Sequence, residues 1–279
     1  MKTCVVIGGA RWGRILAQKF RGLGFNARTA TAFPAEPSDI TRVDIARMDP
    51  RPDLIYVASR SADHERDYLE MAALGAPVWV EKNFSGTSVS LREQFLSGDN
   101  LLFTQQLFNT SIDRNIGMLP QLTKFDVAVE IDRPVMNRTQ LFDWVGHDLG
   151  LLARVMWLRG FSGAEGVECT AGYEAGSYVL RYRAAGVRCG VTLTPADKTL
   201  RLLRLDGGDR LYARRDGVLH LAPGGVTAEP GQQDLLGDAL AVALRAGADD
   251  RRRLTAITMD LHEATFPELA DLPYQGGGI

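Results

Sequence analysis

The sequence has few cysteines and no long apolar or basic segment, and each absence excludes a class of protein. Three cysteines occur among 279 residues, Cys4, Cys169 and Cys189. They are odd in number and far apart, which excludes a disulfide framework and a zinc cluster of the C-x-x-C type. No apolar run approaches the roughly 18 residues of a membrane helix. The net charge of −2 and the lack of a long basic block give no sign of nucleic acid as a partner.

What remains is the composition of an ordinary globular protein. Apolar residues make up 45% of the chain and charged residues 24%, which is typical of soluble domains. No basic segment followed by an apolar one precedes the first strand, so we expect a cytoplasmic protein that binds neither a membrane nor a metal. A chain of this length predicts two domains, because single cores stop growing at about this size.

The first third of the chain alternates apolar strands with amphipathic helices. This order predicts a parallel sheet with right-handed crossovers, and so a dinucleotide-binding Rossmann domain over residues 1–106. The expected strands are 4–7, 26–31, 54–58, 78–80 and 101–103, and the expected helices are 14–23, 62–74 and 89–96.

From residue 107 onward the pattern changes. A strand at 125–130 and a helix at 144–158 precede a series of β segments between residues 167 and 213, separated by turns. Two helical regions follow, at 235–245 and 252–263. We predict that residues 107–279 form an α+β domain with an open, mainly antiparallel sheet and helices on one face.

A glycine-rich turn follows the first strand. Gly8-Gly9-Ala10-Arg11-Trp12-Gly13 matches G-x-G-x-x-G at its first and third glycines, with Ala10 in the middle position. Such a turn lets backbone N–H groups approach a pyrophosphate at the start of a helix. The alternative is a strand-to-helix turn that simply needs small residues.

Four stretches together resemble one known family. They are 8–13, 59–64 (Ser-Arg-Ser-Ala-Asp-His), 81–83 (Glu-Lys-Asn) and 143–149 (Asp-Trp-Val-Gly-His-Asp-Leu). In this order and spacing the chain resembles, over nearly its whole length, the glucose-fructose oxidoreductase and inositol dehydrogenase family, often called Gfo/Idh/MocA. The resemblance implies a Rossmann domain, an open-sheet second domain and an NAD(P)-dependent oxidoreductase.

The resemblance also implies catalytic residues. Lys82 matches the family lysine beside the nicotinamide and the reacting carbon, although Asn83 replaces the usual proline. A lysine at the end of a strand can donate a hydrogen bond or a proton to a developing alkoxide. Without the neighbouring motifs, the alternative is a surface lysine next to a glutamate.

Asp143 and His147 match the D-x-x-x-H pattern of many sugar and polyol dehydrogenases in the family. On a helix, residues four apart share a face, so the carboxylate can orient the imidazole while the imidazole exchanges a proton with substrate. A plain Asp–His pair on a helix is the alternative.

Cofactor contacts are implied at the positions that match the family. They are Gly8, Ala10, Arg11, Trp12, Gly13, Thr31, Ser59, Arg60, His64 and Glu81. His64 corresponds to a position near the cofactor ribose, and Arg60 departs from the family pattern. The strand at 26–31 ends without the carboxylate that binds the ribose of NAD, which favours NADP slightly, with Arg28, Thr29 or Thr31 as phosphate contacts. Glu36 or Asp39 could supply the missing carboxylate and reverse this preference.

We therefore expect hydride transfer between a nicotinamide and a carbonyl or hydroxyl carbon of a small sugar or polyol-like substrate. The first alternative is reduction of an imine, for example of the thiazoline type, in natural-product biosynthesis. The second is a non-catalytic member of the fold that binds a ligand or partner. Family relatives and an apolar sheet face favour a homo-oligomer, either a dimer or a tetramer.

Overall fold

The computed structural model describes most of the chain, and the chain divides into two compact units. The first unit is Met1–Gln105 with Leu236–Thr255, and the second is Gln106–Leu235 with Ala256–Ile279. The sequence pattern gave no indication that residues 236–255 return to the first unit. The described residues are 1–31, 38–84, 88–108, 126–133, 138–158, 160–163, 166–184, 187–195, 200–205, 210–215, 218–221 and 234–272.

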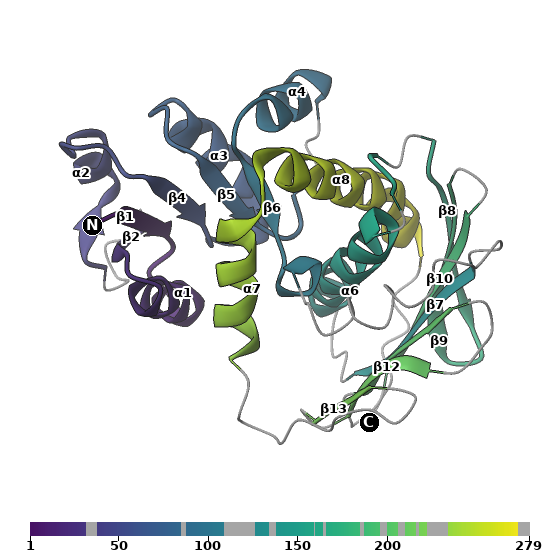
Figure 1. Ribbon diagram of the computed structural model, residues 1–279. Coiled ribbons are helices and arrows are strands. Elements are labelled where there is room, and N and C mark those ends of the chain that lie inside the picture. The colour runs from purple at the N-terminus through teal and green to yellow at the C-terminus, as the bar shows by residue number, and fades with distance from the viewer. Residues whose placement is uncertain are drawn as a thin grey trace. The chain divides into compact units, whose positions relative to one another are not determined.

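The first unit is built on a six-stranded sheet in the order β3-β2-β1-β4-β5-β6, with every pair parallel (Figure 1). This confirms the Rossmann-type sheet predicted from the alternating pattern. The strands are β1 (Thr3–Ile7), β2 (Asn26–Thr31), β3 (Ile40–Thr41), β4 (Leu54–Val57), β5 (Val78–Glu81) and β6 (Leu101–Phe103).

Four helices connect these strands. They are α1 (Arg11–Gly22), α2 (Arg42–Ala46), α3 (His64–Ala72) and α4 (Val89–Ser97), with a short 3₁₀ turn, η1 (Ser61–Asp63), before α3. A second 3₁₀ turn, η2 (Gln105–Phe108), follows β6, and α7 (Leu235–Arg245) returns to this unit from later in the chain. The pair β3 and α2 was not predicted, because two strand residues and five helical residues are too short to show a hydrophobic period.

The core of the first unit lies on both faces of its sheet. Every residue of β4, β5 and β6 is buried, as expected for parallel strands covered on two sides. Aromatic rings fill one region of this core: Tyr56 contacts Phe20 of α1 and Phe103 of β6, at ring distances of 5.7 and 5.8 Å. Trp79 stacks on Phe103. This packing fixes the ends of β4 and β5 relative to α1.

The second unit has a seven-stranded sheet in the order β13-β12-β11-β7-β10-β9-β8. Only the β7–β10 pair is parallel, so the mainly antiparallel sheet that the sequence predicted is confirmed. The strands are β7 (Asp126–Arg133), β8 (Glu168–Glu174), β9 (Ser177–Ala184), β10 (Val187–Pro195), β11 (Leu200–Leu205), β12 (Arg210–Arg215) and β13 (Val218–Leu221).

Helix α6 (Arg138–Leu158) and the later part of α8 (Ala248–Asp271) lie along one face of this sheet (Figure 1). The Tyr182 hydroxyl of β9 is 2.8 Å from the Thr265 hydroxyl of α8, and the rings of Phe142 and Phe266 join the two helices. On β9 the buried Tyr182 alternates with the exposed Arg181 and Arg183, so the opposite face is polar there. Within the described residues, no helix has the length and apolar character needed to cross a membrane.

Candidate functional site

The strand order of the first unit reverses at one point. The chain leaves β1 toward β2 on one side and later returns to β4 on the other side of β1. In open parallel sheets, ligands bind outside the carboxyl ends of the strands at such a switch point. The turn after β1, Ser59 after β4 and Lys82 after β5 all lie at this edge, which we call the carboxyl edge.

Two glycines of the turn after β1 have no room for a side chain. Gly8 has φ +134°, and an added Cβ would lie 2.7 Å from the Ala58 carbonyl oxygen. A Cβ on Gly13 would clash with the carbonyl oxygen of Gly8. Ala10, in contrast, has an extended backbone with φ −67° and ψ 178°, which any residue adopts. The methyl group at the middle position therefore introduces no backbone strain into the turn.

Helix α1 begins without a side-chain cap. Ala10 occupies its N-cap and makes no capping hydrogen bond, and the first turn has no acidic residue. The helices α2 and α4 are capped by Thr41 and Ser88. The first backbone N–H groups of a helix have no partner within the helix, and they attract anions. Helix α3 also lacks a side-chain cap, but its first turn carries the acidic Glu65 and Asp67. Among these four helices, α1 is therefore the one whose start combines a missing cap with no acidic side chain, which favours an anionic ligand.

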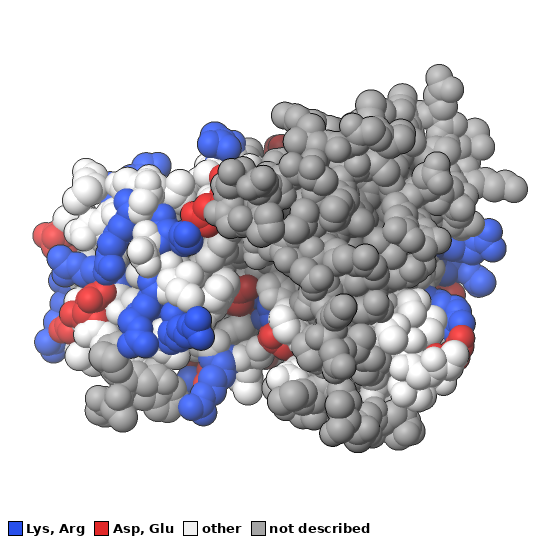
Figure 2. Space-filling view, turned by 90° about the horizontal axis from the view of Figure 1, so that it is seen from below, with Lys and Arg blue, Asp and Glu red and all other residues white. Residues whose placement is uncertain are grey.

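Helix α1 itself is rich in basic residues. Along α1 there are four basic residues and no acidic one, Arg11, Arg14, Lys19 and Arg21. Figure 2 shows Lys and Arg side chains spread over the face of the first unit that is seen from below. The local charge therefore favours a negatively charged group near α1.

A side-chain hydrogen bond connects the end of β5 to the glycine-rich turn. Glu81 and Lys82 are both buried, at 7% and 5% exposure. The Glu81 Oε2 accepts hydrogen bonds from the Tyr56 hydroxyl at 2.7 Å and from Trp12 Nε1 at 3.2 Å. Burial and the neighbouring Glu81 carboxylate raise the pKa of Tyr56 well above its usual value, so the hydroxyl remains a donor.

The residue after Lys82 has a backbone that proline cannot adopt. Asn83 has φ +67°, in the left-handed region that asparagine tolerates, whereas proline is fixed near −65°. Asparagine at this position is therefore compatible with the local backbone, and the family's proline is not. After β5 the chain therefore takes a left-handed backbone conformation at Asn83.

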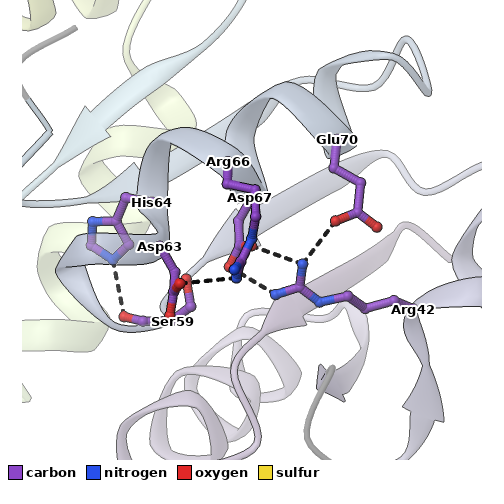
Figure 3. A network of polar contacts seen from close by, with 7 residues as sticks. All are labelled: Arg42, Ser59, Asp63, His64, Arg66, Asp67 and Glu70. Atoms are coloured by element: carbon purple, nitrogen blue, oxygen red, sulfur yellow. Dashed lines mark hydrogen bonds and ion pairs between the residues drawn. The ribbon is translucent and has the colours of Figure 1, made fainter. Parts of the chain in front are cut away.

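A network of charged side chains holds the segment after β4 (Figure 3). Asp67 of α3 is fully buried and accepts two hydrogen bonds from Arg42 of α2, at 2.8 and 2.7 Å. Arg66 also contacts Asp67, and Arg42 reaches Glu70. Burial alone would raise the pKa of Asp67, but hydrogen bonds from Arg42 and Ser59 outweigh it, so the pKa lies below its usual value. Asp67 is therefore a paired carboxylate within the fold.

His64 lies in the same segment and is 2% exposed. Its Nε2 is 3.0 Å from the Ser59 carbonyl oxygen. Burial lowers the pKa of His64, although the Ser59 carbonyl partly opposes this shift. A neutral ring that donates from Nε2 fits these surroundings, and it fixes the backbone at Ser59. Arg60, next in the chain, is exposed.

Asp39 does not lie at the end of β2. Its Oδ2 accepts from the Thr29 N–H at 2.8 Å, from the Thr29 hydroxyl at 3.2 Å and from Arg21 at 3.1 Å. Thr29 is two residues before Thr31, the last residue of β2. The Asp39 carboxylate therefore holds β2 and α1 together, and Glu36, the other acid considered for this role, lies outside the described residues.

The remaining predicted catalytic residues belong to the second unit. Asp143 and His147 are one turn apart on α6 and are partly exposed. The ring of Trp144 lies 5.9 Å from that of His147. Lys82 belongs to the first unit. The three predicted catalytic residues are therefore divided between the two units.

The structure brings most of the predicted cofactor residues to the carboxyl edge. Sequence reasoning missed three residues that hold this edge, Tyr56, Arg42 and Asp67. Tyr56 was hidden in an apolar strand, and Arg42 and Asp67 are ordinary polar residues of short helices. Across the described ranges, no group of three or more His, Cys, Asp or Glu side chains is arranged to hold a metal ion.

Solved structures share this fold over nearly the whole chain. The UDP-N-acetylglucosamine 3-dehydrogenase GnnA from Acidithiobacillus ferrooxidans is 14% identical with a TM-score of 0.67, over 96% of this chain and 99% of that one. GenD2 from gentamicin A biosynthesis, in complex with NAD, is also 14% identical with a TM-score of 0.67, over 97% and 94%.

The WlbA dehydrogenase from Thermus thermophilus, in complex with NAD and UDP-GlcNAcA, is 13% identical with a TM-score of 0.66, over 94% and 95%. These likenesses show the fold. They confirm the two-domain architecture expected from the sequence resemblance. No family model and no curated protein sequence matches the chain.

Proposed function

We propose that the protein is an NAD(P)-dependent oxidoreductase, with the dinucleotide on the first unit and the substrate on the second. One observation supports this most strongly: α1 begins uncapped at the switch point of a parallel sheet, behind two glycines that cannot be replaced. This arrangement suits a pyrophosphate. Two of the similar structures, GenD2 and WlbA, are complexes with NAD.

The residues at the carboxyl edge fit a dinucleotide. The backbone of the turn from Gly8 to Gly13 would hold the pyrophosphate, and Ser59 and His64 would lie near the ribose next to the nicotinamide. When bound, the nicotinamide supplies or accepts the hydride. Thr31 ends β2 without a carboxylate, and Asp39 is already engaged by Thr29 and Arg21, so we propose NADP as the preferred form.

Lys82 is proposed to manage the proton of the reaction. It lies immediately after β5, with its side chain buried. A positioned ammonium can donate a hydrogen bond or a proton to the oxygen that gains charge during hydride transfer to a carbonyl. In the reverse direction, the neutral amine can accept the proton of the substrate hydroxyl. Asp143 and His147 are proposed as the matching pair on the second unit, with Asp143 orienting the imidazole.

The substrate is proposed to be a small sugar or polyol. The likeness to UDP-N-acetylglucosamine 3-dehydrogenase and to WlbA, in complex with UDP-GlcNAcA, supports a hydroxylated substrate. A homo-oligomer, a dimer or tetramer in the cytoplasm, stays a prediction. A panel of sugars, polyols and cyclic imines assayed with each dinucleotide would separate the substrate classes.

Binding and turnover test the proposal together. We expect NADPH to quench tryptophan fluorescence and raise the thermal midpoint, with NADH weaker. Lys82→Met should retain dinucleotide affinity within about threefold but reduce turnover about 100-fold or more, because a positioned acid or base contributes about that factor. Lys2→Met, at an exposed lysine of the same unit, is the matched control. Absence of binding by either dinucleotide would make a non-catalytic role the better account.

A further inference from the structure

The Glu81 carboxylate has an unusual pair of partners for a residue next to the proposed catalytic lysine. Oε2 of Glu81 accepts two hydrogen bonds whose donors come from different places in the first unit. Tyr56 belongs to β4 and is fully buried, whereas Trp12 belongs to the glycine-rich turn and is 39% exposed. Glu81 therefore connects the rigid core of the sheet to a surface turn 69 residues away in the sequence.

The two partners differ in how firmly they are held. Tyr56 packs edge-on against Phe20 and Phe103, so its hydroxyl is fixed by the aromatic core. Trp12 lies in the first turn of a helix whose N-cap provides no side-chain bond. The Trp12–Glu81 hydrogen bond thus attaches the start of α1 to β5. It can order this turn in the absence of a capping side chain.

We infer that Glu81 is a positioning residue that fixes the dinucleotide-binding turn through the indole of Trp12. The inference rests on the proposed function, and it assigns Glu81 a role different from direct cofactor contact. The carboxylate holds Trp12, Trp12 holds the first turn of α1, and the turn presents its N–H groups in a fixed direction. Ordering the turn before binding reduces the entropic cost of association.

A double-mutant cycle on dinucleotide affinity tests this role. Trp12→Phe keeps an aromatic ring but removes the donor, and Glu81→Ala removes the acceptor. Each should weaken NADPH binding about tenfold, since hydrogen bonds to charged groups contribute on that scale. Because both changes break the same bond, the double variant should bind no more weakly than the weaker single variant. Losses that multiply to about 100-fold would overturn the inference.

Two further variants separate positioning from general loss of packing. Glu81→Gln retains an acceptor oxygen and should restore affinity to within about threefold of the parent. Trp79→Phe changes a buried tryptophan of β5 itself, away from the turn, and should lower the thermal midpoint without weakening NADPH binding. If Glu81→Gln binds as weakly as Glu81→Ala, the role assigned to the acceptor oxygen is wrong.

The hydrogen bond can also be observed without any ligand. In a ¹H–¹⁵N spectrum of the indole groups, the Trp12 resonance is the one that Trp12→Phe removes. We expect it to move upfield in Glu81→Ala and to stay near its parent position in Glu81→Gln. If the parent bound neither dinucleotide, the proposed function would fail while this measurement still decided whether Glu81 holds Trp12. A Trp12 resonance unchanged by Glu81→Ala would overturn the inference on its own.

Discussion

The start of α1 and the starts of α2 and α4 differ in where their backbone N–H groups find partners. Thr41 caps α2 in a reciprocal arrangement with Asp44, and Ser88 caps α4. Ala10 leaves α1 without such a bond. The capped helices satisfy their own ends and gain stability. Helix α1, uncapped and without an acidic residue in its first turn, leaves these groups for a ligand at the switch point of the sheet.

The largest effect on dinucleotide affinity is expected at the start of α1, where Gly13 lies, and no effect is expected at Gly22 near its end. Gly13→Ala places a methyl group against the Gly8 carbonyl, so we expect the turn to shift and NADPH affinity to fall about 100-fold or more. Gly22→Ala, in the last turn of the same helix, meets nothing within 4 Å. It should leave binding unchanged and stabilise the protein by up to about 1 kcal/mol. Titration calorimetry measures the NADPH affinity of the two variants, and urea unfolding measures their stability. Normal NADPH binding by Gly13→Ala would contradict the proposed pyrophosphate site.

The buried ion pair beside the site should affect stability rather than binding directly. Asp67→Asn leaves Arg42 without its buried partner, and we expect a loss of about 3 kcal/mol in urea unfolding at pH 7. Glu174→Gln at the exposed Arg181 pair is the control and should cause no measurable change. A loss from Asp67→Asn as small as that control's would show that the pair is not structural.

The Asp67 pair also predicts a pH dependence with a definite sign. Its folded pKa is lowered, so its stabilising effect is present above the unfolded value of about 3.9 and is lost as pH falls through the folded pKa. The difference between parent and Asp67→Asn should therefore shrink below about pH 4. Unfolding curves between pH 3 and pH 7 measure it, and a constant difference across that range would contradict the pairing.

Adding a cap to α1 should change stability and binding in opposite directions. Ala10→Asp can accept from the first-turn N–H groups, so we expect a gain of about 1 kcal/mol without ligand. The same carboxylate would occupy the place of the pyrophosphate and repel its negative charge, so the affinity for NADPH should fall at least tenfold. Ser88→Ala is the mirror control, with about 1 kcal/mol lost and binding retained. Tighter binding by Ala10→Asp would place the phosphates elsewhere.

The smallest effect concerns His64. Burial lowers its pKa, so the neutral ring stabilises the fold above the unfolded pKa of about 6.5, and this stability is lost as pH falls toward the folded pKa. Between pH 7.5 and pH 5 the parent should lose more stability than His64→Gln. Parallel pH profiles of the two proteins would contradict a buried neutral imidazole.

Local pattern was sufficient for the strands of the first unit other than β3 and for the glycine-rich turn, but not for how they meet. The apolar run 54–58 and the glycines at 8 and 13 are visible in the sequence because periodicity and backbone geometry are local properties. The Trp12–Glu81 bond joins residues that sequence reasoning had chosen separately for cofactor contact. Their contact depends on the tertiary path of β5, which no local pattern records.

Asn83 shows the opposite case. From the sequence it was a departure from the family motif, whereas its positive φ makes it the residue that the backbone allows. The Arg42–Asp67 pair was not predicted, because it joins α2, too short to be recognised, to an otherwise ordinary polar position of α3. The return of residues 236–255 to the first unit likewise depends on long-range packing.

Hydrogen–deuterium exchange with and without saturating NADPH tests the central claim most directly. If the uncapped start of α1 holds the pyrophosphate, exchange should slow in peptides that cover residues 8–16, while peptides covering the capped start of α4, residues 88–96, should stay unchanged. Binding of NADPH with no protection at residues 8–16 would contradict the account.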